Sequence, residues 1–229
     1  LSRRQWVGVL VFGLCQNALY LGLNFVAMQT IEASLAAIIA STMPLLVALA
    51  GWLIMGQRIR PLGIMGLIAG VVGVTLIMGA RLQGGVDMFG LILCVIGVVS
   101  LTIATLVVLG ASSGGNVLMI VGLQMLVGSA ILWIPALMFE TFDITWNWQL
   151  IVAFIYTTLV PGLVATWVWF TLVGRIGAVK ASTFHFLNPF LGVAIAAVLL
   201  GERIGMLDVV GVVVIAGGIL AVQLSKQPT

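Results

Sequence analysis

The sequence contains two related apolar stretches, "ASLAAIIASTMPLLVALAGWLIMGQRI" at residues 33–59 and "AVKASTFHFLNPFLGVAIAAVLLGERI" at residues 178–204. Each has a proline inside the apolar run and a Gly-X-Arg-Ile turn at its end, and Pro44 and Pro189 lie 145 residues apart. Proline inside a helix removes a backbone hydrogen bond, so matching prolines in two such runs indicate a shared role. The two stretches therefore predict an internal repeat built from interrupted apolar helices.

The composition is that of a membrane protein. Of 229 residues, 62% are hydrophobic and 7% are charged, whereas soluble domains carry about 25% charged residues. A run of about 20 apolar residues can cross a bilayer as a helix, and these runs lack the alternation of barrel strands. We predict eight spans, at roughly 6–28, 33–56, 61–80, 88–110, 117–139, 149–174, 178–200 and 206–224. The expected fold is an all-α integral membrane bundle without a soluble domain.

The loops sort by charge if successive spans cross in alternate directions. One side carries only basic residues: Arg3, Arg4, Arg58, Arg60, Arg175, Lys180 and Lys226. The other side carries Arg81 and Arg203 with all six acids: Glu32, Asp87, Glu140, Asp143, Glu202 and Asp208. By the positive-inside rule, the first side and the C-terminus are expected in the cytoplasm. The basic residues are scattered and form no patch for nucleic acid.

The offset of 145 residues defines the expected domains. It places the first three spans on the last three without a gap, and places Gly66 and Gly73 on Gly211 and Gly218. The spans at 88–110 and 117–139 have no counterpart in the first half, so about 60 residues and two helices are expected before Leu1. The expected domains are an incomplete first repeat, residues 1–85, and a five-helix second repeat, residues 86–229. Units with an odd number of spans insert with opposite topology, which predicts an inverted repeat.

Polar residues follow one face of the first span. Gly13, Asn17, Tyr20 and Asn24 recur at helical spacing, with Gln16 beside them. At the offset of 145, the second unit has Thr158, Gly162, Ala165 and Trp169 at these positions, with Pro161 beside them. Such a face either joins helices by hydrogen bonds or lines a path for a solute. We favour a path, because three amides exceed what helix association needs.

The prolines at 44, 161 and 189 are each expected to free the carbonyl four residues earlier. Pro44 and Pro189 fall near mid-membrane, where transporter sites formed by broken helices lie; the alternative, favoured for Pro135, is a kink that only shapes packing. His185, the only histidine, is either a functional residue or a neutral ring hydrogen-bonded within the bundle. The candidate substrate-binding residues are Gln16, Asn17, Tyr20, Asn24, Ser41, Pro44, Thr158, Pro161, Trp169, His185, Asn188 and Pro189.

The sequence shows no catalytic set, metal-ligand cluster or phosphate loop, so we expect neither an enzyme nor a cofactor or metal. No span carries a carboxylate, and His185 alone is left as a candidate proton carrier. We therefore favour downhill movement of substrate over tight proton coupling, with His185 as a binding or packing residue.

The two quoted stretches, with a Gly-rich helix after each, resemble the EamA-type branch of the drug/metabolite transporter superfamily. The resemblance covers the whole chain and implies two inverted five-helix repeats, with eight of ten transmembrane helices present here. It departs from the pattern at Gln57, which stands where the second turn has Glu202.

The resemblance implies a carrier of small metabolites in the bacterial inner membrane that works by alternating access, with the lipid bilayer and its substrate as partners. Within the family, the chain is similar to the YddG-type exporters of aromatic amino acids, whose cavity lies between the two units. That likeness implies export of aromatic or other apolar amino acids; the alternative is a nucleotide-sugar or multidrug carrier of the same superfamily. The oligomeric state stays open, and a monomer is compatible with the sequence.

Overall fold

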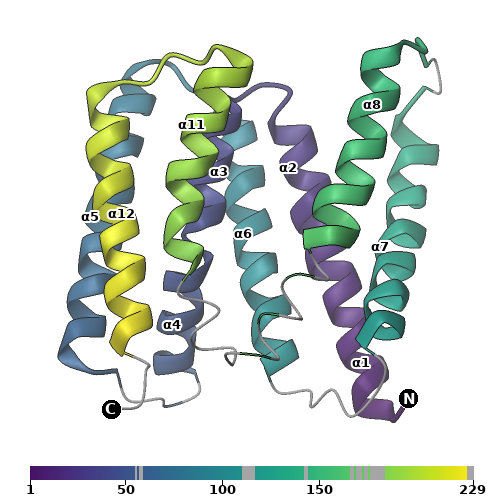
Figure 1. The fold of residues 1–229 in the computed structure, drawn as a ribbon, viewed down its shortest axis with the longest axis horizontal. Helices are drawn as coiled ribbons and strands as arrows, with labels where there is room; N and C mark the ends of the chain where they lie inside the picture. The colour runs from purple at the N-terminus through teal and green to yellow at the C-terminus, as the bar shows by residue number, and fades with distance from the viewer. Residues whose placement is uncertain are drawn as a thin grey trace.

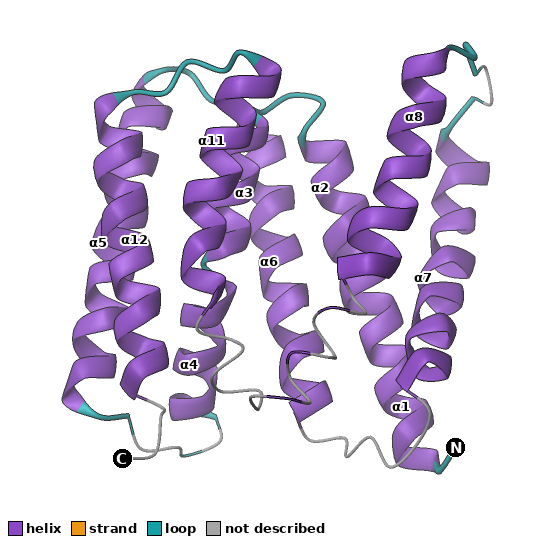
Figure 2. Ribbon diagram, viewed as in Figure 1, coloured by secondary structure: helices purple, strands orange, loops and turns teal. Residues whose placement is uncertain are grey.

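The computed structural model describes residues 1–54, 56, 59–109, 117–141, 144–165, 168, 172, 175 and 184–225. All regular elements within these ranges are helices (Figure 1, Figure 2). Six are long and apolar enough to cross a membrane: Arg3–Ala27, Ala33–Leu53, Pro61–Gln83, Met88–Val107, Met119–Phe139 and Met206–Ser225. Two shorter apolar helices, Trp148–Gly162 and Asn188–Leu200, occupy the two remaining predicted spans. The predicted all-α membrane fold is confirmed.

The long helices are divided into shorter elements where their hydrogen bonding changes. In chain order the structure has α1 (Arg3–Phe12), the π-helix η1 (Gly13–Tyr20), α2 (Leu21–Ala27), α3 (Ala33–Ser41), α4 (Met43–Leu53), α5 (Pro61–Gln83), α6 (Met88–Leu109), α7 (Val117–Phe139), α8 (Trp148–Thr157), the π-helix η2 (Thr158–Val164), the 3₁₀ helix η3 (Phe184–Leu187), α11 (Asn188–Leu200) and α12 (Met206–Ser225). The first predicted span is thus α1, η1 and α2 together, and the second is α3 and α4 together.

Helices α5 and α12 lie side by side and touch through glycine. A Cβ added to Gly66 would lie 2.6 Å from the carbonyl oxygen of Gly218, and a Cβ added to Gly73 would lie 2.9 Å from that of Gly211. Contacts this close leave no room for a side chain, so the two backbones are in direct contact. As the residue number rises along α5 it falls along α12, which makes the two helices antiparallel.

These glycine contacts are reciprocal. The offset of 145 residues pairs Gly66 with Gly211 and Gly73 with Gly218, whereas in space Gly66 meets Gly218 and Gly73 meets Gly211. Exchanging each glycine for its counterpart turns the first contact into the second. Such self-complementary pairing is what a two-fold axis produces, and the antiparallel direction is what opposite insertion of the two units requires.

The two ends of the bundle differ in charge. Both chain termini lie at one end, which also carries Arg3, Arg4 and Arg60 (Figure 1). We call this the termini end. The opposite end is formed by the segments 28–32, 84–87, 140–141, 144–147 and 201–205, and we call it the acidic end because Glu32, Asp87, Glu140 and Glu202 lie there.

The apolar core lies where α3, α5, α6 and α12 meet. Leu35 and Ile38 of α3, Ile77 of α5, and Ile215 and Ile219 of α12 are almost completely buried. By contrast, α8 has no buried residue. Within the described part of the chain, the well-packed region therefore includes α3 and leaves α8 at the edge.

Candidate functional site

Two π-helices lie at matching positions of the repeat. Moving Gly13–Tyr20, the bounds of η1, by 145 residues gives 158–165, and η2 spans Thr158–Val164. A π-helix is rare and occurs frequently at functional sites, because its i→i+5 hydrogen bonds widen the turn and redirect side chains. The candidate residues Gln16, Asn17 and Tyr20 lie in η1, and Thr158 and Pro161 lie in η2.

The beginning of η1 packs against α7. A Cβ added to Gly13 would lie 2.7 Å from the carbonyl oxygen of Gln124, and one added to Gly128 would lie 2.3 Å from the Cβ of Asn17. Gln16 and Asn17 are both half-buried. This part of the predicted polar face therefore contacts a neighbouring helix closely.

Asn24 of α2 is buried and hydrogen-bonded within the bundle. Its Nδ2 donates to the carbonyl oxygen of Tyr20 at 2.7 Å, and its Oδ1 accepts a hydrogen bond from the Sγ of Cys94 at 3.4 Å. A Cβ added to Gly97 would lie 2.7 Å from the same Nδ2. The hydrogen bond from Cys94 to Asn24 thus connects α6 to α2.

A cavity of about 190 Å³ lies between α2 and α3. Its lining consists of Tyr20, Leu21, Asn24, Phe25, Met28, Ala33, Ala36, Ala37 and Ala40. The four alanines follow the spacing i, i+3, i+4 and i+7, so they share one face of α3. We call this space the alanine cavity. None of these lining residues is charged, so the cavity suits an apolar or uncharged group.

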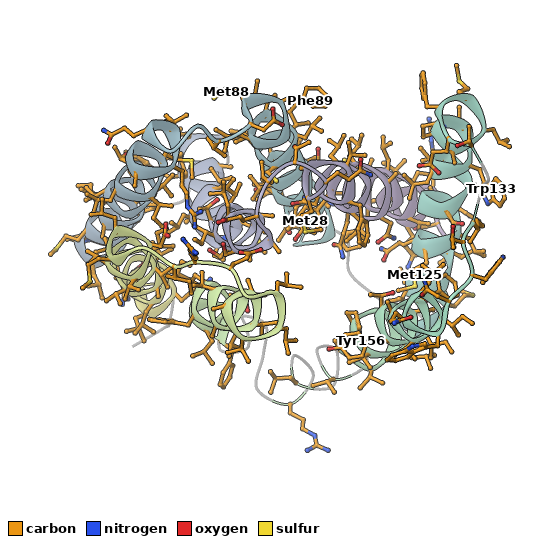
Figure 3. The ribbon with its side chains drawn as sticks, turned by 90° about the horizontal axis from the view of Figure 1, so that it is seen from above. Met28, Met88, Phe89, Met125, Trp133 and Tyr156 are labelled. Carbon is orange, nitrogen blue, oxygen red and sulfur yellow. The ribbon has the colours of Figure 1, made fainter. Side chains whose placement is uncertain are left out.

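The view from above places this region within the fold (Figure 3). The described helices form an arc, with Met28 on its inner side and Met88 and Phe89 on its outer side. Met88 and Phe89 are 52% and 63% exposed, as expected for residues that face lipid. Met28, which lines the alanine cavity, therefore lies on the inner side of the arc.

The break predicted at Pro44 lies at the end of the alanine cavity. Helix α3 ends at Ser41, and α4 begins at Met43 with Pro44 buried in its first turn. The hydroxyl of Ser41 donates to the carbonyl of Ile38 at 2.6 Å, and that of Thr42 donates to the carbonyl of Ile39 at 2.7 Å. The backbone N–H of Thr42 also donates to the carbonyl of Ile39, at 3.1 Å, so side chains and backbone together bond the carbonyls at the end of α3.

The second interrupted helix meets the same wall. Pro189 is fully buried in the first turn of α11, directly after η3. Nδ2 of Asn188 lies 3.1 Å from Nδ1 of His185 in a hydrogen bond whose direction depends on the histidine tautomer. One turn later, a Cβ added to Gly192 would lie 2.6 Å from the Cβ of Ala37. Gly192, one turn after Pro189, thus packs directly against the alanine face of α3.

The remaining candidates lie elsewhere. Thr158 and Pro161 are exposed in η2 and are absent from the cavity lining found among the described residues. Trp169 lies outside the described residues. Pro135 lies inside α7, which continues through it. Across the described residues, no group of three or more His, Cys, Asp or Glu is arranged to hold a metal ion.

Charged residues at the acidic end form a second cluster around a cavity of about 610 Å³. The guanidinium of Arg81 donates to Asp208 from Nε at 3.2 Å and from Nη2 at 3.0 Å, and it also pairs with Glu32. The carboxylate of Glu202 accepts hydrogen bonds from the backbone N–H of Ala33 at 2.7 Å and of Ser34 at 3.0 Å. Arg81, Asp208, Glu32 and Glu202 thus already have partners within the protein. We therefore take the alanine cavity as the candidate substrate site.

Asp87 closes the same end of the bundle at the start of α6. Its Oδ2 accepts hydrogen bonds from the hydroxyl of Thr30 and from the backbone N–H of Gly90, each at 2.7 Å. The hydroxyl of Thr30 and then the backbone N–H of Gly90 lower the pKa of Asp87, because both stabilise its ionised form. Asp87 is therefore the N-terminal cap of α6.

Sequence reasoning missed two parts of this site. The alanine face of α3 has a sequence signal, small residues at helical spacing, but the stretch was interpreted only through Pro44. Glu202 was recognised only as part of a turn, and its contact with Ala33, 169 residues away, has no local signal.

Comparison with known proteins connects these observations to a family. The family model of EamA-like transporters matches residues 1–79 and 88–224. The chain is 27% identical over 226 residues to the uncharacterized transporter YvbV of Bacillus subtilis (strain 168), a match that covers 98% of this chain and 74% of that protein. It is 25% identical over 236 residues to the uncharacterized transporter YetK of the same strain, covering 98% of this chain and 67% of that protein. This chain is a multi-pass membrane transporter of small molecules and belongs to the EamA-like transporter family.

Proposed function

We propose that the protein exports aromatic or other apolar amino acids and related metabolites by alternating access. The alanine cavity is the observation that supports this proposal: the small side chains of α3 leave space for an apolar group opposite Tyr20 and Asn24. A nucleotide sugar would bring phosphate charges into a wall without a cationic partner, which is unfavourable in a buried site. An amino acid can place its apolar side chain against this wall, while its ammonium and carboxylate groups stay together at one end and need polar partners only there.

In this proposal the polar end of the substrate meets residues at the interrupted helices. Ser41 and Pro44 lie at the end of the alanine face. His185 of η3 and Asn188 and Pro189 of α11 precede Gly192, which packs against that face. The units at residues 1–85 and 86–229 rock against each other around this site. The termini end faces the cytoplasm of a bacterial cell, in accordance with its basic residues, and transport involves no catalytic step and no cofactor.

Uptake by proteoliposomes containing the purified full chain tests the proposal. Labelled phenylalanine, tryptophan and leucine are the substrates, and nucleotide sugars and cationic drugs are the competitors. Ala40→Leu adds three carbon atoms to the cavity wall, and we expect uptake to fall about tenfold, the effect of about 1.4 kcal/mol of lost binding. Ala194→Leu is the matched control, because Ala194 is exposed on α11. Wild-type uptake by Ala40→Leu, or competition by nucleotide sugars alone, would contradict the proposal.

A further inference from the structure

The carboxylate of Glu202 holds the first turn of α3. Helix α11 ends at Leu200, Gly201 reverses the chain with a φ of 69°, and Glu202 follows at once. Its Oε1 accepts the N–H of Ala33 at 2.7 Å, and its Oε2 accepts that of Ser34 at 3.0 Å. N–H groups in the first turn of a helix have no partner within the helix, and the helix dipole favours a negative charge there. The contact is therefore a charge-assisted pair of hydrogen bonds.

Arg81 connects the same two edges of the bundle. It lies in the last turn of α5 and bridges Glu32, directly before α3, to Asp208 in the first turn of α12. The side chain of Asp208 is only 6% exposed and that of Arg81 is 17% exposed, so water screens this bridge weakly. Asp208 also accepts the N–H of Gly205 at 2.9 Å, which fixes the turn that carries Glu202.

The Glu202 contact lies at the acidic end of the alanine face, and the Arg81 bridge lines the neighbouring cavity of about 610 Å³. Ala33 donates to Glu202 and also lines the cavity, while Ala40 lies at the other end of the same alanine face. A displacement of the α11–α12 turn away from α3 would therefore uncover the cavity from the acidic end.

We propose that Glu202, seated on the first turn of α3 and supported by the Arg81 bridge, is the gate that closes the alanine cavity at the acidic end. The inference rests on transport by alternating access. In the state seen here the gate is closed, and its opening breaks both hydrogen bonds to α3. Glu202 acts as a positioning residue and makes no contact with substrate.

The repeat makes this gate one-sided. The position 145 residues before Glu202 is Gln57, and the positions that correspond to Asp208 and Glu32 are Gly63 and Gly177. None of the three corresponding positions therefore carries a carboxylate. A neutral amide gains less from a helix dipole than a carboxylate does, so a gate built from those positions would be weaker than the gate at the acidic end.

Distance measurements between two spin labels test the gate without any substrate. Cysteines at Gln29 and Met206, exposed on either side of the gate, carry the labels, with Cys15→Ala and Cys94→Ser removing the native thiols. Double electron–electron resonance on the full chain in lipid bilayers reports the populations of short and long distances. Glu202→Gln makes the turn identical in sequence to residues 56–59. We expect the ratio of long to short distances to rise about tenfold, which corresponds to about 1.4 kcal/mol.

Ala33→Pro tests the same gate from the other side. It deletes the N–H that donates to Oε1, and proline is tolerated at the first position of a helix. Glu32 precedes it in an extended conformation, φ −67° and ψ 142°, which suits a residue before proline. This variant should raise the ratio by less than Glu202→Gln, because one of the two hydrogen bonds remains.

Arg203→Gln is the matched control, since it removes one charge from an exposed residue of the same turn, and its distances should equal those of the wild type. Unchanged distances in both gate variants, or an equal shift in Arg203→Gln, would overturn the gate. So would failure of both gate variants to fold, because the contact would then be needed for folding rather than for gating. An opened gate with no uptake of amino acids would refute only the proposed substrate.

Discussion

Replacing Gly66 with alanine should separate the two helices that join the halves of the bundle. The added Cβ would lie 2.6 Å from the carbonyl oxygen of Gly218 and 2.9 Å from the backbone nitrogen of Val222. Both neighbours are backbone atoms, so neither can turn aside as a flexible side chain would. Helix α5 must move away from α12, and the packing around Ile215 and Ile219 must move with it.

The expected destabilisation is the difference of two effects. Inserting a methyl group into a packed interface costs about 1–3 kcal/mol, and exchanging glycine for alanine within a helix returns about 0.5–1 kcal/mol. The net loss is about 1.25 kcal/mol at the middle of these ranges and about 2.5 kcal/mol at most. The middle value should lower the melting temperature by about 2–5 °C for a chain of this size. Gly79→Ala is the matched control in the same helix, because nothing lies within 4 Å of its added Cβ.

Thermal unfolding in detergent micelles provides the measurement. Cys15 and Cys94 are free and buried, so a thiol-reactive dye becomes fluorescent only as the helices separate. We expect Gly79→Ala to melt at or above the wild-type temperature and Gly66→Ala below it. The double variant Gly66→Ala with Gly218→Ala should lose less than the sum of the single variants, because the first substitution already separates the backbones. A Gly66→Ala variant as stable as Gly79→Ala would refute the close contact of α5 with α12.

Three further predictions concern other parts of the bundle. Asp87→Ala should lower the melting temperature at pH 7 by removing the cap of α6, whereas Glu140→Ala, at an exposed position, should not. The pKa of Asp87 is lowered in the folded protein, so the stabilisation by Asp87 is complete above the unfolded pKa of about 3.9 and is lost as the pH falls through the folded pKa. The difference in melting temperature between wild type and Asp87→Ala should therefore vanish in strong acid. Pro44→Ala and Pro189→Ala should each straighten a helix and slow uptake more than they lower expression, and wild-type uptake in both would leave these prolines with a packing role only. In proteoliposomes with an imposed pH gradient, His185→Gln should retain exchange that does not depend on the gradient; uphill accumulation that the gradient drives and the variant abolishes would make His185 a proton carrier.

The spans and the repeat could be predicted from the sequence because both depend on local composition. The apolar run predicted at 117–139 is α7, and the run predicted at 206–224 is α12, Met206–Ser225. The prolines at 44 and 189 also fall where helices are interrupted. In each case the signal is carried by the same residues that form the element, so no knowledge of distant partners is needed.

The orientation of the polar face could not be predicted, because the spacing argument assumed an α-helix. Residues four, three and four apart share a face only at 3.6 residues per turn, and η1 has the wider turn of a π-helix. Asn17 consequently packs against α7, while Asn24 is bonded to Cys94 of α6. The role of these residues in binding substrate remains a prediction, and Tyr20 and Asn24 are the two that line the alanine cavity.

In this bundle the glycine contacts of α5 and α12 are expected to determine stability, and the contact of Glu202 with α3 is proposed to determine gating. The position of each contact relative to the two-fold axis of the repeat accounts for this difference. A contact on a two-fold axis is unchanged when the two units exchange roles, so under the proposed alternating access the reciprocal glycines of α5 and α12 can persist in both states. The contact of Glu202 with α3 lies away from that axis, and in the proposal it is broken in the opposite state. If both units had the same sequence, the two states would have equal free energy. Gln57 in place of a second glutamate removes that equality, so Glu202→Gln should change the ratio of the two states, whereas Gly66→Ala should weaken the bundle in both.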